Sequence, residues 1–168
     1  MDVKIFDNFL SSDDFATIKN NIFGHEFPWY YQDVVAYRSV PNDVEDYYHA
    51  HILYQNDRVT STWYENVYNL VIPKIREVSE YHSLIRIKVN SYAHSSIVKE
   101  NEQHRDYDFF SYGGILSLNT CNGFTRLSDG SKIDSVENRF HIFDSSKPHN
   151  SSTTSDCKRR VNINFNWN

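Results

Sequence analysis

Two hydrophobic periods divide the chain, and the change between them falls near residue 84. Before it, apolar residues recur every three to four positions over residues 12–22 and 61–79, which is the period of an amphipathic helix. After it, apolar and polar residues alternate, which is the period of a half-buried strand. We therefore expect a mainly β protein with flanking helices in its N-terminal half.

The ends of the two helices have local signals. Ser11 and Asp14 have the spacing of a capping box at the start of the first helix, and Gly24 follows its end. Pro73 lies inside the second helical pattern and should kink or restart that helix, because proline lacks the N–H that the helix needs. Both helices are expected to cover one face of a sheet.

The remaining segments predict short strands. Residues 27–35 are typical of a loop entering a strand, and Asp129-Gly130 is typical of a hairpin turn. The predicted strands cover residues 47–54, 84–92, 112–119, 123–127, 132–136, 139–143 and 160–167. Antiparallel strands in this number favour a jelly roll, or double-stranded β-helix, of the cupin-like type.

Length and composition agree with this prediction. A chain of 168 residues fits a single domain, with helical support and first strands over about 1–82 and the β core over about 84–168. The 12 Tyr, 11 Phe and 3 Trp favour pleated structure over a helical bundle.

Charge and cysteine content exclude several classes of protein. A formal charge of −5 disfavours a nucleic-acid or anionic-membrane binder. No apolar run is long enough to span a bilayer, and residues 1–9 do not resemble a signal peptide. We expect a soluble cytoplasmic protein, in the host cytoplasm if a phage encodes it. Cys121 and Cys157 form no Cys-x-x-Cys pair and are expected to be free and buried.

His104 and Asp106 are the candidate centre of the chemistry. In an extended segment, residues i and i+2 point the same way at a spacing of about 6–7 Å, so one metal ion could contact both. An imidazole, a carboxylate and one distant imidazole form the facial triad that holds non-heme Fe(II). His149 is the candidate third ligand, and Asp108 is the alternative carboxylate because it lies on the same face.

Arg159 and Arg160 follow His149 at the start of the last predicted strand. A planar guanidinium matches a carboxylate with two parallel charged hydrogen bonds, so either arginine suits a metal-chelating 2-oxo acid. From Arg160 onward, polar residues alternate with apolar ones. The polar face is either the outside of an edge strand or the wall of a cavity, where Arg160 would be a buried cation without an anion.

The order His104-x-Asp106, His149, Arg160 is similar to that of the 2-oxoglutarate- and Fe(II)-dependent dioxygenases, in their prolyl 4-hydroxylase-like branch. Residues 122–127, 138–144 and 160–165 also resemble stretches of that branch. The resemblance covers nearly the whole chain. It is greatest to small phage and marine bacterial members, which share a Phe-Pro-Trp-Tyr-Tyr segment.

The resemblance implies Fe(II) on His104, Asp106 and His149 within the β core, with 2-oxoglutarate and O2 as co-substrates and ascorbate as a candidate reductant. It implies hydroxylation of a C–H bond, with a prolyl residue of a peptide or protein as one candidate substrate and small molecules as others. Arg160 is the implied anchor of the distal carboxylate, with Arg159 as the alternative. Tyr92 is a candidate second contact, because Ser117 stands where some animal members carry a tyrosine.

Two other functions stay open, a non-catalytic jelly-roll binding or structural module and a cupin-like metal enzyme that does not use 2-oxoglutarate. The polar segment 93–103 has no clear period and is a candidate mobile lid. The other histidines are expected at the surface or in hydrogen bonds, with His49-x-His51 on a strand surface. They are His25, His49, His51, His82, His94 and His141.

Overall fold

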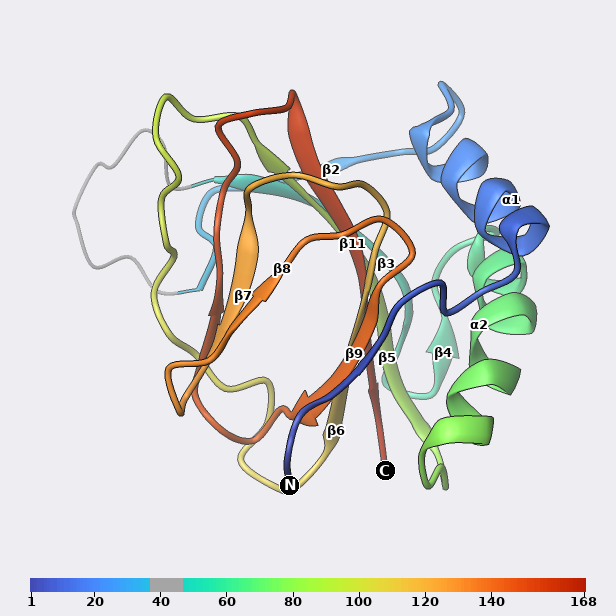
Figure 1. Ribbon diagram of the computed structural model, residues 1–168. Coiled ribbons are helices and arrows are strands. Elements are labelled where there is room, and N and C mark those ends of the chain that lie inside the picture. Colours follow the sequence, from blue (N-terminus) through green and yellow to red (C-terminus); the bar gives the residue numbers. More distant parts are fainter. Residues whose placement is uncertain (37–46) are drawn as a thin grey trace.

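Two antiparallel sheets face each other in the computed structural model, which describes residues 1–36 and 47–168 (Figure 1). The major sheet has the order β1-β9-β6-β11-β5-β3-β2, with β4 paired to β3, and the minor sheet has the order β10-β7-β8. The strands are β1 (Lys4–Phe6), β2 (Tyr30–Gln32), β3 (Tyr48–Gln55), β4 (Arg58–Val59), β5 (Leu84–Ala93), β6 (Tyr112–Ser117), β7 (Phe124–Leu127), β8 (Lys132–Asp134), β9 (Phe140–Asp144), β10 (His149–Ser151) and β11 (Arg159–Trp167). This arrangement confirms the predicted double-stranded β-helix.

Two helices cover the outer face of the major sheet (Figure 1), as predicted. In α1 (Ser12–Phe23), the Ser11 hydroxyl accepts a hydrogen bond from the Asp14 N–H at 3.1 Å, which satisfies a free donor of the first turn. The second helix, α2 (Tyr64–Val78), continues through Pro73, so the predicted restart is wrong. Its buried residues on both sides of the proline hold the two halves against the core, and this packing outweighs the lost hydrogen bond.

The hydrophobic core lies between the helices and the major sheet. Strand β11 contributes Val161, Ile163, Phe165 and Trp167, each with 0% of its surface exposed. The helices contribute buried side chains spaced one helical turn apart, which follow the period seen in the sequence. The apolar positions that predicted the two helices are therefore the ones that pack into the core.

The strands missed by the sequence prediction are the short ones. Strands β1, β4 and β10 contain three residues or fewer, too few for alternation to be recognised. Strand β2 ends at Gln32, so Val34 and Val35 lie outside it. The predicted turn at Asp129-Gly130 does join β7 to β8, with Gly130 at a φ of 86° that favours glycine.

Neither helix in the described parts of the chain has the length and apolar character that crossing a bilayer requires.

Candidate active site

The polar face of β11 points into the space between the two sheets. Its residues are as buried as those of the apolar face, from 0% exposed at Asn166 to 7% at Asn164. Strand β5 places a second polar row beside it, because Arg86 pairs with Asn166 and Tyr92 pairs with Arg160. Of the two alternatives left by the sequence, the cavity wall is therefore the correct one.

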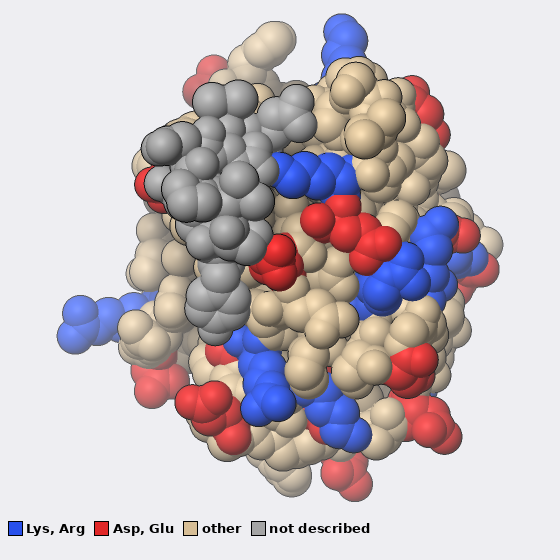
Figure 2. Space-filling model, turned by 90° about the vertical axis from the view of Figure 1, so that its left-hand side faces the viewer, with Lys and Arg blue, Asp and Glu red and all other residues tan. Residues whose placement is uncertain are grey.

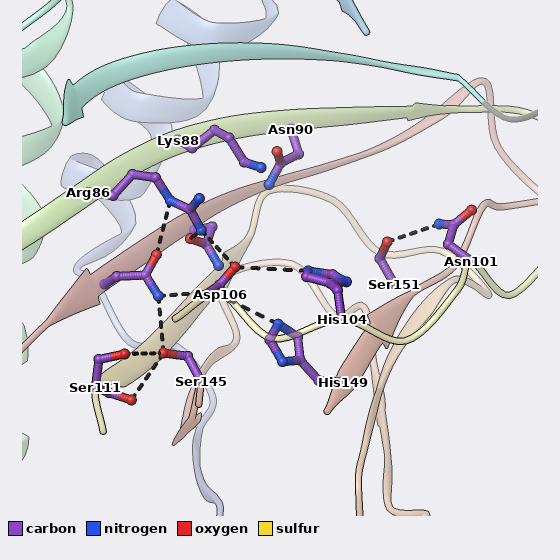
Figure 3. A network of polar contacts seen from close by, with 12 residues as sticks. Arg86, Lys88, Asn90, Asn101, His104, Asp106, Ser111, Ser145, His149 and Ser151 are labelled. Carbon is purple, nitrogen blue, oxygen red and sulfur yellow. Dashed lines mark hydrogen bonds and ion pairs between the residues drawn. The ribbon is translucent and has the colours of Figure 1, made fainter. Parts of the chain in front are cut away.

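Backbone pairing brings the three candidate metal ligands together at one end of this space. His104 and His149 exchange two backbone hydrogen bonds of 2.9 Å, and the Asp106 N–H donates to the Ser145 carbonyl at 3.0 Å. The Nε2 atoms of both histidines lie 3.9 Å from a carboxylate oxygen of Asp106 (Figure 3). Asp108 is exposed and lies outside this group.

The three donors fit a single metal ion. One ligand atom each from His104, Asp106 and His149 lies within 4.8 Å of the others. An ion with bonds of about 2.1 Å holds ligands on one face about 3.0 Å apart, so the side chains would close by about 1 Å from their 3.9 Å separations to bind it. The ring Nδ1 of His149 lies 3.0 Å from the Lys147 carbonyl, which leaves Nε2 as the atom with a free lone pair. Two imidazoles and one carboxylate are the donor set preferred by non-heme Fe(II).

The charges of the site also suit metal binding. Burial alone would raise the pKa of Asp106, but the charge of Arg86, helped by His149, lowers it to about 2. Burial and the neighbouring His149 lower the pKa of His104 to about 4. Near neutral pH, Asp106 is therefore ionised and His104 neutral, which are the forms that bind a cation.

Asp106 is held by two side chains that the sequence interpretation did not select (Figure 3). Arg86 Nη2 donates to Asp106 Oδ1 at 2.8 Å, and Asn166 Nδ2 donates to Asp106 Oδ2 at 2.9 Å. Arg86 Nε also donates to Asn166 Oδ1 at 3.1 Å. The sequence signal for both residues was the alternation on their strands, but alternation does not say which face is covered by a second sheet.

Arg160 lies at the other end of the polar rows and is 1% exposed. Its Nη1 donates to the Ser152 carbonyl at 3.2 Å and its Nη2 to Thr125 Oγ1 at 3.0 Å, while Nε has no partner. Its Cζ lies 5.5 Å from the centre of the Tyr92 ring. No carboxylate of the described residues pairs with it. Arg159 points to the opposite face and packs on the aromatic rings of Phe23 and Trp29.

Gly123 is required by the path of the Arg160 side chain. A Cβ at this position would lie 2.6 Å from the Thr153 carbonyl oxygen and 2.7 Å from Arg160 Cδ, too close for either to be tolerated without a shift. Glycine therefore allows the guanidinium to reach the interior.

Two histidines do not lie where the sequence prediction placed them. His141 is 1% exposed, and neither of its ring nitrogens has a hydrogen-bond partner in the part of the chain that the structure describes, so it lies neither at the surface nor in a hydrogen bond there. Burial and the charge of Arg160 lower its pKa to about 3. His51 is 4% exposed, packed on Phe27, and not on a strand surface. The sequence showed only alternation and could not show how these faces are covered.

The segment proposed as a mobile lid is tied to the chain that follows His149. Hydrogen bonds of 2.9 Å join Ser95 N to the Thr154 carbonyl, Asn101 N to the Ser151 carbonyl, and Thr153 N to the Lys99 carbonyl. This backbone pairing opposes free movement of the segment.

Both cysteines are free, as predicted, but only Cys121 is buried and Cys157 is partly exposed. With Asp156 they form a second group of potential metal donors within 4.8 Å of one another. The Asp156 carboxylate already accepts hydrogen bonds from the Asn122 N–H and the Thr154 hydroxyl, which gives this group an ordinary structural role.

Comparison with solved structures finds this fold in enzymes. A prolyl hydroxylase from Trichoplax adhaerens, solved with a hypoxia-inducible-factor peptide fragment, is 17% identical with a TM-score of 0.67, over 98% of this chain and 82% of that chain. An oxidoreductase of the 2OG-Fe(II) oxygenase family from Burkholderia pseudomallei is 8% identical with a TM-score of 0.71, over 98% of this chain and 84% of the other. This chain has the fold of the 2-oxoglutarate- and Fe(II)-dependent oxygenases.

The fold alone does not determine the reaction. The non-heme α-ketoglutarate-dependent epimerase SnoN from nogalamycin biosynthesis is 10% identical with a TM-score of 0.69, over 99% of this chain and 77% of its own. No protein-family model and no curated protein sequence matches the chain.

Proposed function

We propose that this protein is a 2-oxoglutarate- and Fe(II)-dependent dioxygenase that hydroxylates a C–H bond. The observation that supports it best is the convergence of His104, Asp106 and His149 inside a fold that also buries Arg160 without a carboxylate partner from the described residues. When bound, Fe(II), 2-oxoglutarate and O2 supply the oxidising chemistry. The protein binds and orients these groups and limits access of water to them.

In this proposal, His104, Asp106 and His149 hold Fe(II) on one side and leave the other coordination positions open. Arg86 and Asn166 orient the Asp106 carboxylate, since each donates to one of its oxygens. Such supporting hydrogen bonds keep a ligand in place before the metal binds.

Arg160 is proposed to bind the distal carboxylate of 2-oxoglutarate. A buried guanidinium without a counter-ion is unfavourable, and a bound carboxylate would neutralise it. Burial raises the pKa of Tyr92, so its hydroxyl stays protonated and able to donate to the same carboxylate. His141, whose pKa is lowered by burial and by the charge of Arg160, lies in the same interior with both ring nitrogens unpaired among the described residues.

The proposed substrate is a peptide or protein, with a prolyl residue as the candidate target, in the cytoplasm. The peptide bound to the Trichoplax prolyl hydroxylase supports this choice by analogy of fold. A small-molecule substrate is the alternative within the same function.

The decisive experiment is an anaerobic titration of the metal-free protein with Fe(II) and then 2-oxoglutarate. We expect the weak visible charge-transfer band of a chelated 2-oxo acid in the wild type and its absence in His149→Ala. Folded wild-type protein that gives no band would contradict the proposal and favour a non-catalytic binding module.

A second variant tests the role of Arg160. Arg160→Ala should weaken 2-oxoglutarate binding by about 100-fold, because a charged bidentate contact is lost, while Fe(II) affinity stays within about threefold. A cupin-like enzyme that does not use 2-oxoglutarate would be indifferent to this change. Equal loss of both ligands would count against the assignment of Arg160.

A further inference from the structure

A pocket of ≈ 900 Å³ lies beside the candidate metal centre. Tyr48, Arg86 and Lys88 form its more buried part, and exposed residues such as Arg58 form its rim. Arg86 joins this pocket to the centre, since its guanidinium also donates to Asp106 at 2.8 Å. A molecule bound in the pocket would therefore touch the wall of the metal centre.

The pocket is positive although the chain is acidic. Its described lining contains three cations, Arg58, Arg86 and Lys88, and no Asp or Glu, while the whole chain carries a formal charge of −5. On the face of the molecule shown in Figure 2, Lys and Arg are interspersed with Asp and Glu. The positive charge of the pocket is thus a local property and not that of a basic surface.

Within the described part of the chain, Lys88 is the less exposed of the two cations of this pocket that lack an ion pair, the other being Arg58 at the rim. It lies on the same side of β5 as Arg86 and Asn90, the side that faces Asp106 and His104 (Figure 3). Its ammonium contacts the Tyr48 hydroxyl at 3.4 Å and lies 5.5 Å from the centre of that ring. Among the residues that the structure describes, no carboxylate lies within ion-pair distance of it.

Arg86 does not have the same freedom. Its Nε and Nη2 donate to Asp106, Asn164 and Asn166, and its charge is paired with Asp106. Only the N–H groups of Nη1 remain for a bound molecule. Among the described residues, the Lys88 ammonium has one weak hydrogen-bond partner, the Tyr48 hydroxyl at 3.4 Å, and the residue is partly exposed where it lines the pocket. Burial and the charge of Arg86 lower the pKa of this ammonium to about 8, so it is still charged near neutral pH. A partly buried ammonium without a paired carboxylate gains from a bound anion.

We propose, on the basis of the dioxygenase function proposed above, that the substrate carries a carboxylate near its reacting carbon and that Lys88 binds this group. The distal carboxylate of 2-oxoglutarate is a separate anion. Lys88 and Tyr92 are four residues apart on β5, about 13 Å along the strand, and Arg160 pairs with the Tyr92 end. The substrate carboxylate comes from an acidic residue of a peptide or from a small organic acid.

The test compares probes that differ only in one negative charge. The peptide pair is a blocked tetrapeptide with Glu or Gln before a proline, and the small-molecule pair is N-acetylproline and N-acetylprolinamide. Binding is measured by calorimetry without O2, on protein loaded with Mn(II) and 2-oxoglutarate, so that turnover is not needed.

Three proteins are compared, the wild type, Lys88→Met and Lys74→Met. Methionine keeps the length of the side chain and removes its charge. Lys74 is a partly exposed lysine of α2 that pairs with Glu77 outside the pocket. We expect the wild type and Lys74→Met to bind the acid of one pair about tenfold more tightly than its neutral partner. Lys88→Met should lose this preference. The probe pair in which the wild type prefers the acid tells whether the carboxylate belongs to an acidic residue of a peptide or to a small organic acid.

The visible band of the Fe(II) and 2-oxoglutarate complex separates the two proposals. Suppose that the wild type and Lys88→Met both show the band, but the wild type binds the acidic probes no more tightly than their neutral partners, or binds neither. The inference about Lys88 is then overturned, and the dioxygenase function stands. Retention of the acid preference in Lys88→Met also overturns it. If the wild type gives no band, the dioxygenase function itself fails.

Discussion

The two faces of strand β11 are equally buried and chemically opposite. Toward the helices, Phe165 and Trp167 are 0% exposed and belong to the hydrophobic core. Toward the minor sheet, Asn164 and Asn166 are 7% and 0% exposed and take part in a polar network. Burying apolar groups stabilises a fold, whereas burying polar groups costs free energy unless each is hydrogen-bonded. The first face therefore supports the structure, and the second is the face to which the proposed function assigns its role.

The face of the major sheet that looks toward the minor sheet also carries polar atoms without hydrogen-bond partners, on β5, β9 and β11. Arg160 Nε, both ring nitrogens of His141 and Asn90 Oδ1 are buried without a hydrogen-bond partner among residues 1–36 and 47–168. Native proteins leave few such groups, and each calls for a partner such as water or a ligand. Their position between the two sheets is where the proposed function requires co-substrate and substrate to bind.

The largest effect is expected on the helix side. Phe165→Ala should lower the free energy of unfolding by about 3–5 kcal/mol, because a fully buried aromatic ring is replaced by a cavity. Urea denaturation measures this loss. Metal affinity of the protein that remains folded should be unchanged, and a loss of metal binding without a loss of stability would contradict the division between the two faces.

Asn166→Ala should act on the metal centre. Asp106 loses one of its two side-chain hydrogen bonds, so Fe(II) or Mn(II) affinity should fall about 10- to 100-fold. Asn162→Ala is the matched control, since Asn162 lies on the same face but bonds to Asn90. Equal metal affinities of the two variants, measured by calorimetry, would remove Asn166 from the role proposed for it.

His141 predicts a dependence of stability on pH. Its pKa is about 3 in the folded protein against an ordinary value of 6.5, so the unfolded chain binds the proton first as pH falls. Stability should therefore decrease below about pH 6.5, by about 2 kcal/mol from this residue at pH 5. His141→Leu should flatten the curve between pH 7 and pH 5, while the exposed His82→Leu should not.

The smallest effect is expected for a polar pair away from the metal centre. The double variant Asn90→Val/Asn162→Val should change the free energy of unfolding by less than about 1 kcal/mol, because both partners of a 3.0 Å hydrogen bond are replaced together. Thermal or urea denaturation checks it. A loss comparable to that of Phe165→Ala would show that the polar face also supports the fold.

Much of the fold could be predicted because its signals are local. The capping box at Ser11, the helical period before residue 84 and the alternation after it correspond to α1, α2 and the long strands β5 and β11. Strand β10 could not be predicted, because its three residues become a strand only by pairing with β7. Continuation of α2 through Pro73 likewise depends on packing that a local pattern does not contain.

The candidate site, too, could be predicted from the sequence only in part. The order of His104, Asp106, His149 and Arg160 along the chain was enough to predict that they act together, because each residue type suits one role around a metal and a 2-oxo acid. The choice of Asp106 over Asp108 and of Arg160 over Arg159 was not decided by the sequence. It depends on which side chains face the interior.

By itself, the sequence determined the two helices, the long strands, the alternation of β11 and the types of residue available for chemistry, because these depend on local spacing. Only the tertiary structure decided that the polar rows of β5 and β11 face a second sheet. That placement brings Arg86 and Asn166 to Asp106 and leaves Lys88 beside them without a counter-ion from the described residues. Alternation specifies two faces of a strand, but what covers each face is decided by segments far away in the chain.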